Sequence, residues 1–226
     1  MGDMIEFASN GSTAQGYLAV PESGSGPGVL VIQEWWGLVD HIKDVCDRFA
    51  DAGFVALAPD LYHGVETDEP DEAGKIMMQM ELPRAAADMQ GAVSALLGLE
   101  STTGSAVGAV GFCMGGGLVL WLSTIDERVA ACVPFYGAIP WDDTQPDYTA
   151  SHAAYLGHYA EEDSWATLDG AKQLLAHLTD LGHDVTFHFY PGTGHAFFND
   201  SRPEAYDAEA STQAWDRTIA FFRSRL

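Results

Sequence analysis

The chain has 226 residues, of which 47% are hydrophobic, and 33 Asp and Glu against 10 Lys and Arg give a formal net charge of −23. This length suits one sizeable core, and the hydrophobic content excludes a disordered chain. No apolar run reaches transmembrane length, and the first residues do not have the pattern of a signal peptide. We therefore expect a single cytoplasmic domain over residues 1–226, with the monomer as the favoured state.

The excess of carboxylates is the most unusual feature of the composition. Its field repels phosphate and anionic lipid, so we expect neither nucleic acid nor a membrane as a partner. Mutual repulsion of carboxylates also weakens a compact fold, and it is screened at ~1 M salt, where the Debye length is about 3 Å. The charge therefore favours a halophilic protein, and an ordinary acidic protein is the alternative.

The hydrophobic pattern predicts strands and helices in alternation. Residues 4–22 have the pattern of an antiparallel hairpin at one edge. Strands are then expected at 28–34, 54–61, 106–112, 129–137, 153–160 and 184–191. Helices are expected at 41–53, 83–99, 115–125, 167–182 and 205–225. The polar stretch 62–82 is expected to be a loop or cap insertion, with a helix only over 75–80, and the acidic segment 138–151 is expected to be irregular.

This alternation predicts an α/β fold. A mostly parallel central sheet would carry helices on both faces, and the N-terminal hairpin would add an antiparallel edge. In such sheets, functional groups collect where the strands end.

Cys113 lies at such a strand end, in the sequence Gly111-Phe112-Cys113-Met114-Gly115. Two glycines that flank a nucleophile at this spacing are typical of a strained strand-to-helix turn. Glycine is needed there because a β-carbon would collide, and the helix N-terminus favours a thiolate. The N–H of Met114 would then stabilise an oxyanion. The alternatives are a buried structural thiol, close helix packing or a phosphate-binding turn.

His195, in a glycine-rich loop after the last expected strand, is a candidate general base. Glu161, Glu162 and Asp163 follow the preceding strand, and the pattern leaves open which of them orients the histidine. The order nucleophile, acid, histidine is that of α/β-hydrolases. The other histidines and the three cysteines lack metal-ligand spacing, so we expect no metal site.

Glu34 ends the first buried strand of the alternating pattern. A carboxylate is costly to bury unpaired, so Glu34 either lies at the rim of the sheet or helps to take or hold the proton of the Cys113 thiol. The next residue, Trp35, lies where the second oxyanion-hole N–H arises in α/β-hydrolases.

From about Gly28 onward the chain resembles the dienelactone hydrolases, also called carboxymethylenebutenolidases. The stretches QEWWG, APDLY, GFCMGG and GTGHAFF occur in that family's order and at roughly its intervals. The resemblance implies the α/β-hydrolase fold, no cofactor, and hydrolysis of an enol lactone or related small ester through an acyl-enzyme. It assigns Cys113 as the nucleophile, His195 as general base and acid, Asp163 as the triad acid, Glu34 as the thiol-activating carboxylate, and Trp35 and Met114 as oxyanion-hole amides.

The chain departs from the family pattern near the expected substrate. The family arginine that follows the triad histidine by four residues is Asn199 here, and the insertion offers only Lys75 and Arg84. Val-Pro shortly after the triad aspartate is replaced by residues 164–166, Ser-Trp-Ala. The candidate substrate-binding residues are Trp36, Arg84 and Arg202, and the alternative for each arginine is a surface cation that offsets nearby carboxylates. We therefore expect small neutral esters or lactones to be turned over comparably with anionic ones.

Two other classes of function stay open. One is a non-catalytic or redox-sensing protein in which Cys113 is a responsive thiol, and the other is a cysteine amidase or peptidase. A sensor needs no aligned base and acid, so the presence of Glu34, Asp163 and His195 together with Cys113 argues against it.

The net charge generates a prediction about salt. We expect the melting temperature to rise between ~0.1 and ~2 M NaCl, where the screening length falls from about 9 to about 2 Å. Thermal unfolding followed by circular dichroism checks this, and a flat or falling melting temperature would contradict the halophilic interpretation.

Overall fold

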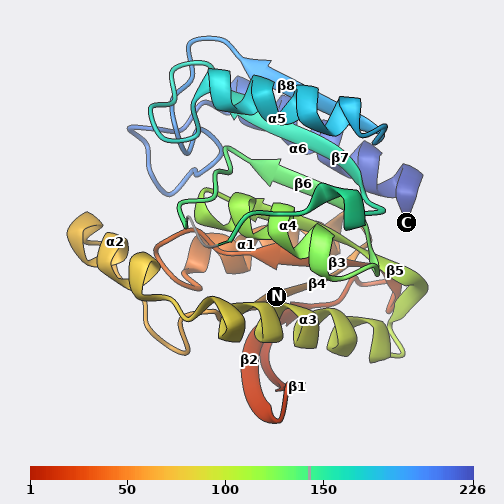
Figure 1. The fold of residues 1–226 in the computed structure, drawn as a ribbon. Coiled ribbons are helices and arrows are strands. Elements are labelled where there is room, and N and C mark those ends of the chain that lie inside the picture. The colour runs from red at the N-terminus through yellow and green to blue at the C-terminus, as the bar shows by residue number, and fades with distance from the viewer. Residues whose placement is uncertain (142–143) are drawn as a thin grey trace. The chain divides into compact units, whose positions relative to one another are not determined.

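The computed structural model describes residues 1–141 and 144–226 and comprises two compact units (Figure 1). The first unit contains Met1–Ala109 and Leu226, and the second contains Val110–Arg225. The expectation that the chain is one domain stays a prediction.

In the first unit, an antiparallel hairpin forms the predicted edge. β1 (Asp3–Ser9) pairs antiparallel with β2 (Ser12–Ala19), and Asn10 and Gly11 between them have φ angles of 39° and 83°. An Asn-Gly pair adopts such angles most readily, so it sets the register of the hairpin. The strand order is β1-β2-β4-β3-β5, and β4 runs antiparallel to β2 and parallel to β3. The remaining strands are β3 (Gly26–Ile32), β4 (Val55–Pro59) and β5 (Thr102–Phe112), whose last three residues belong to the second unit.

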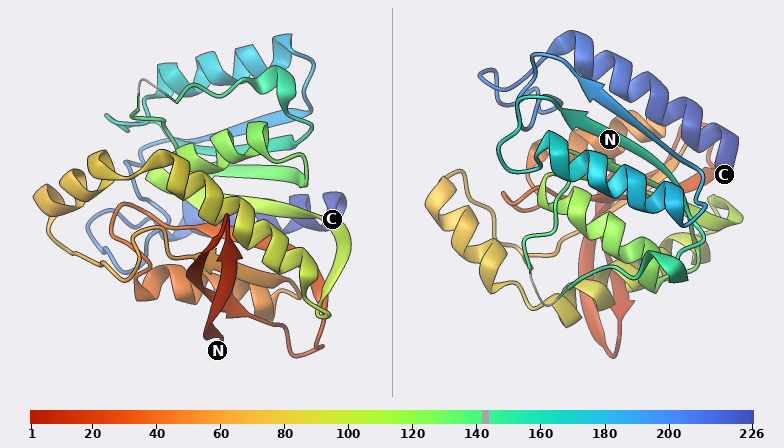
Figure 2. Two further views of the ribbon diagram at one scale, coloured as in Figure 1. Left: turned by 60° about the horizontal axis from the view of Figure 1, so that its bottom comes forward. Right: turned by 45° about the horizontal axis from the view of Figure 1, so that its top comes forward.

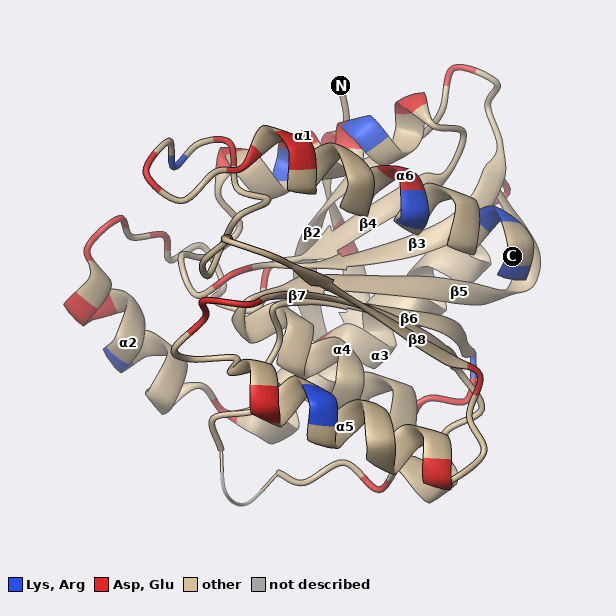
Figure 3. Ribbon diagram, turned by 90° about the horizontal axis from the view of Figure 1, so that it is seen from above, with Lys and Arg blue, Asp and Glu red and all other residues tan. Residues whose placement is uncertain are grey.

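Helices cover both faces of the first unit's strands. Figure 3 shows α1 (Asp40–Asp51) and α3 (Leu82–Gly98) on opposite faces. Ile42, Val45 and Phe49 of α1 are fully buried, as are Met89 and Val93 of α3. Their spacing of three, four and seven residues forms one apolar stripe on each helix, which explains why both helices pack on the strands.

The predicted loop over residues 62–82 is partly wrong, because α2 spans Pro70–Gln79 and not only residues 75–80. Pro70 occupies the first turn, where its missing N–H costs nothing, and Asp71 and Glu72 complement the positive helix N-terminus. Only Ala73 and Met77 of this helix are buried. Figure 2 shows α2 at the periphery of its unit, so it is an insertion carried on few core contacts.

The second unit has the parallel strand order β6-β7-β8. Its strands are β6 (Val129–Phe135), β7 (Ala154–Ala160) and β8 (Val185–Tyr190). Its helices are α4 (Met114–Ile125), the 3₁₀ turn η1 (Tyr148–Ala150), α5 (Leu168–Asp180) and α6 (Ala208–Arg225). Figure 3 shows α4 and α5 on one face of these strands and α6 on the other. Apart from α2 and from β5, which begins four residues earlier than predicted, the predicted elements are confirmed to within three residues. Residues 142–143 of the segment expected to be irregular lie outside the described residues.

In each unit, the charged residues lie mainly outside the strands. Figure 3 shows the Asp and Glu positions mainly on loops and helices, while the strands are largely free of them. The carboxylate excess is therefore carried mostly by the solvated parts of the chain. Within residues 1–141 and 144–226, no helix is long and apolar enough to span a membrane.

Candidate active site

The second unit holds Cys113 in a sharp turn between β5 and α4. Its φ and ψ angles are 56° and −120°, a combination that L-residues rarely adopt. The Cys113 N–H donates a hydrogen bond of 3.1 Å to the Phe135 carbonyl, and the Cys113 carbonyl accepts from Gly116 and Gly117. These bonds fix both sides of the strained peptide, so the backbone determines where the side chain points.

Glycines make this turn possible. A β-carbon on Gly111 would lie 2.1 Å from the carbonyl oxygen of Gly115, and one on Gly116 would lie 2.6 Å from the α-carbon of Gly137. Real side chains do not tolerate such distances. The expected steric need for glycine is therefore confirmed at Gly111, where the obstacle to a side chain is the first turn of α4 itself.

A histidine–aspartate pair lies in the same unit. His195 is in the loop after β8, and its Nδ1 is 2.6 Å from Oδ2 of Asp163, which follows β7. The other carboxylate oxygen, Oδ1, accepts hydrogen bonds from the N–H groups of Trp165 (2.7 Å) and Ala166 (3.0 Å). Asp163 is 6% exposed, and both of its oxygens are engaged. Of the three candidate carboxylates in this loop, the structure thus pairs Asp163 with His195.

The surroundings of His195 favour its protonated form. Burial lowers the pKa of the ring, but hydrogen bonds to Asp163 and to Cys113, together with the charges of both, outweigh burial and raise the pKa to about 10. The hydrogen bond to Cys113 brings the third side chain to the pair. Tyr136 and Trp165 hold the ring edge-on, with centroid distances of 5.0 and 5.2 Å.

Met114 is the first residue of α4 and is fully buried, so its peptide lies at the helix N-terminus beside Cys113. Arg202, in the loop after His195, has Nη1 at 3.8 Å from Oε1 of Glu204. Asn199 is 1% exposed, and its Oδ1 accepts hydrogen bonds from the N–H and hydroxyl of Ser201. The side chain at the family arginine position thus stabilises its own turn.

The other predicted site residues belong to the first unit. Glu34 lies two residues after β3 and is 1% exposed, which places a carboxylate in a buried position. The rings of Trp35 and Trp36 lie 4.9 Å apart and edge to face. Arg84 on α3 has Nε at 3.5 Å from Oδ2 of the buried Asp88, so it has a carboxylate neighbour within its own unit.

Sequence reasoning missed two residues of this site. Tyr136 directly follows β6, has a φ of 38° and is fully buried against His195. Trp165 was noted only as a departure from the family pattern, whereas its N–H and its ring both contact the pair. A position just after a strand end was the available signal for Tyr136. Over the described ranges, 1–141 and 144–226, no group of three or more His, Cys, Asp or Glu side chains is placed to hold a metal ion.

The raised pKa of His195 generates a prediction. An ordinary histidine has a pKa of about 6.5, so the native state binds the proton more tightly than the unfolded chain. This contribution to the free energy of unfolding is fully present below pH ~6.5 and is lost as pH rises through about 10. We expect the ¹⁵N resonances of the ring to report a protonated His195 at pH 8.

An Asp163→Asn variant should lower the pKa of His195, because it removes the anionic partner. His158 is an internal control in the same spectra: burial lowers its pKa well below the ordinary value, and it should stay neutral. A His195 midpoint near 6.5 in the unmodified chain would contradict the geometry.

Comparisons with known proteins identify the family and the fold. The model of the dienelactone hydrolase family matches residues 14–226. "Protein usf" of Aquifex pyrophilus is 39% identical, and "Putative carboxymethylenebutenolidase" of Aquifex aeolicus is 35% identical, each over the whole of both chains. A solved structure from Klebsiella pneumoniae, "Putative Dienelactone Hydrolase", has a TM-score of 0.87 at 25% identity and covers 99% of each chain. The predicted α/β-hydrolase fold is confirmed, and the chain belongs to the dienelactone hydrolase family.

Proposed function

We propose that this protein hydrolyses small esters or lactones through an acyl-enzyme formed on Cys113. The observation that carries the proposal is the joint placement of three side chains. Cys113 lies on a strained turn at a helix N-terminus, hydrogen-bonded to a His195 that is oriented by the buried Asp163. A redox-sensing thiol requires neither of these partners.

In the proposed first step, Cys113 attacks the carbonyl carbon as a thiolate. Because the pKa of His195 is about 10, the imidazole ring holds the proton at neutral pH. Its Nδ1 is engaged by Asp163, so Nε2 delivers the proton to the leaving alkoxide as the carbon–oxygen bond breaks. In a lactone this oxygen stays on the acyl chain.

In the second step, water attacks the thioester while His195 accepts a proton from it. The carbon–sulfur bond breaks, the acid is released and the thiolate is restored. The N–H of Met114 at the start of α4 is suited to stabilise the oxyanion in both steps. The family resemblance adds the N–H of Trp35 as the second donor.

Glu34 is proposed as the carboxylate that helps to take or hold the thiol proton before substrate binds. Its support is its burial at the end of β3 and its match to the family glutamate.

The proposed substrates are uncharged. The position of the family arginine is occupied by Asn199, whose Oδ1 serves Ser201, and both Arg84 and Arg202 have carboxylates within 4 Å. An anionic lactone would also meet the repulsion of a chain with net charge −23. Dienelactone itself is therefore not the substrate proposed for this chain.

Replacing the nucleophile tests the proposal. Wild-type protein should release a burst of 4-nitrophenol from its acetate that matches the number of active sites. Cys113→Ala should abolish the burst, and Cys113→Ser and His195→Ala should lower kcat/KM by several orders of magnitude, since losses of such groups commonly cost about 10³–10⁶-fold. Stopped-flow absorbance measures all three variants.

Cys132→Ala is the matched control in the same unit. The Cys132 thiol is fully buried, burial raises its pKa, and it donates to the Val119 carbonyl, so it should react with neither ester nor iodoacetamide. A folded Cys113→Ala protein with wild-type esterase activity would refute the nucleophile assignment.

The role of Glu34 is tested separately through the thiol. Glu34→Gln keeps the shape and removes the charge, so we expect slower alkylation of Cys113 by iodoacetamide and slower acylation with an unchanged melting temperature. Glu66→Gln, at a half-exposed carboxylate 3.4 Å from Lys43, is the control for a lost surface charge. Alkylation and turnover rates that are unchanged by Glu34→Gln across pH 5–9 would eliminate the role.

A further inference from the structure

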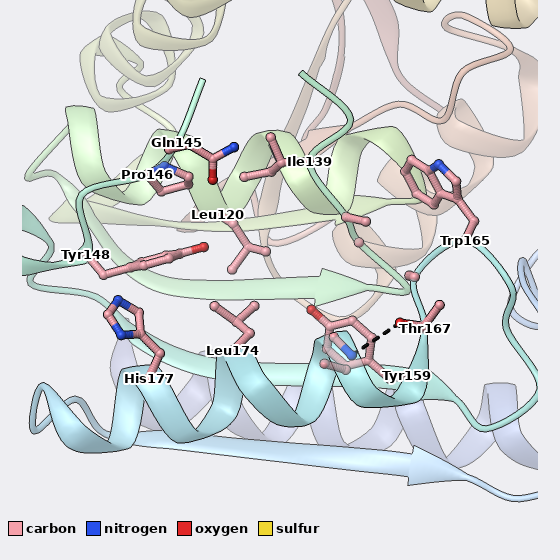
Figure 4. A pocket seen from close by; sticks show the side chains of 15 residues that line it. Leu120, Ile139, Gln145, Pro146, Tyr148, Tyr159, Trp165, Thr167, Leu174 and His177 are labelled. Carbon is pink, nitrogen blue, oxygen red and sulfur yellow. Dashed lines mark hydrogen bonds between the residues drawn. The ribbon is translucent and has the colours of Figure 1, made fainter. Parts of the chain in front are cut away.

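A cavity of about 490 Å³ opens in the second unit beside the catalytic pair. Its walls come from α4, the segment after β6, η1, β7 and α5, and Figure 4 shows the side chains that face it. This volume is typical of sites for small organic molecules. The mechanism described above uses none of the side chains that fill its far end.

The described lining combines apolar side chains with the polar but uncharged Gln145 and Thr167 and with His177. Leu120 and Leu174 face each other across the cavity in Figure 4, with Ile139 above and aromatic rings at both ends. None of the described residues in its wall is Asp, Glu, Lys or Arg. In a chain with net charge −23, a wall without any carboxylate favours an uncharged, mainly apolar occupant.

One buried polar group is directed into this space. Tyr159 on β7 is 1% exposed, and its hydroxyl has no hydrogen-bond partner among the described residues. Figure 4 shows the hydroxyl oxygens of Tyr148 and Tyr159 pointing into the cavity from opposite ends. Burial, with the charges of Cys132 and Asp163, raises the pKa of Tyr159, so its hydroxyl stays protonated and can donate.

Tyr155, four residues earlier on the same strand, is a buried tyrosine whose hydroxyl has hydrogen-bond partners within the protein. It is 1% exposed as well, and its hydroxyl is hydrogen-bonded to those of Ser123 (2.9 Å) and Ser151 (2.6 Å). Leaving a buried donor unpaired destabilises a fold. A ligand acceptor in the cavity would give Tyr159 the partner that Tyr155 finds within the protein.

The cavity shares a wall with the catalytic pair. Trp165 lines it and lies edge-on to His195, with ring centroids 5.2 Å apart. Ala166 lines it and donates its N–H to Asp163. Gly137, at the cavity edge, directly follows Tyr136, whose ring also contacts His195. A group bound in the cavity is therefore separated from His195 and Asp163 only by residues that line the cavity and contact this pair.

We propose that the cavity is a substrate subsite that binds the non-reacting group of the ester, and that this group is uncharged, aromatic or similarly apolar, and carries a hydrogen-bond acceptor for Tyr159. The inference rests on the proposed hydrolase function. It names the class of substrate: neutral esters or lactones with a bulky apolar group that contains a carbonyl or ether oxygen.

Binding is measured in the Cys113→Ala chain, which keeps the cavity and lacks turnover. The probes are acetophenone, α-methylstyrene, which has the same shape without the acceptor, and benzoate, which is charged. Chemical shifts of the backbone amides of Gly137, Gly170 and Leu174 report occupancy. We expect saturable binding of acetophenone, about tenfold tighter than either other probe, as one hydrogen bond to a buried donor supplies.

Adding Tyr159→Phe should weaken acetophenone binding about tenfold and leave α-methylstyrene binding unchanged. Its melting temperature should not fall, since the hydroxyl removed has no partner. Tyr155→Phe, the matched control on β7, should lower the melting temperature and leave both affinities unchanged. Equal affinity for the three probes, or no effect of Tyr159→Phe on acetophenone binding, would overturn the proposed recognition.

Kinetics in the active chain test the subsite role. Leu174→Trp narrows the cavity from the half-buried face of α5 and should lower the ratio of kcat/KM for 4-nitrophenyl benzoate to that for the acetate by about tenfold or more. An unchanged ratio would refute the subsite. Failure of the wild-type chain to hydrolyse either ester would instead refute the hydrolase function, which separates the two proposals.

Discussion

The candidate active site depends on one strained residue, Cys113. A φ of 56° with a ψ of −120° costs on the order of 1–3 kcal/mol, and it persists only where the surrounding structure requires it. That requirement comes from packing: Gly116 and Gly137 approach so closely that neither has room for a β-carbon, and the Phe135 carbonyl accepts the Cys113 N–H. The contact between α4 and the end of β6 thus holds the thiol out of the sheet at the helix N-terminus.

Partners at contact distance also explain why a strongly acidic chain keeps a protonated histidine. The net charge of −23 is spread over solvated loops and helices, where salt screens it over about 10 Å or less. His195 responds to partners at contact distance instead. Asp163 is held on one side by two backbone N–H groups and on the other by the ring, so its charge is fixed in place. Local geometry, not net charge, determines the raised pKa.

The sequence predicted the parts of the site that follow from sterics and periodicity. The glycines around Cys113 indicate a turn because a β-carbon on Gly111 would collide with the backbone of the turn itself. The order of strands indicates where loops meet. The choice of Asp163 over Glu161 and Glu162 was not available from composition, because it depends on which carboxylate accepts the Trp165 and Ala166 amides. The start of α2 was missed because its apolar face is narrow, with only Ala73 and Met77 buried. The cavity was not predictable, since Leu120, Tyr148 and His177 come together only through tertiary packing.

Two buried polar side chains, Asn199 and Tyr159, both support the proposal of an uncharged substrate. Asn199 lies where the family resemblance implies a carboxylate-binding arginine, and its amide carries no positive charge to pair with an anion. Tyr159 lies in a wall whose described residues include no Asp, Glu, Lys or Arg, and its buried hydroxyl has no hydrogen-bond partner among the described residues. A carboxylate placed beside Tyr159 would give up its hydration for few donors, whereas a neutral carbonyl gives up far less. The proposed preference for an uncharged substrate therefore has a local cause at each position, in addition to the repulsion exerted by the acidic surface.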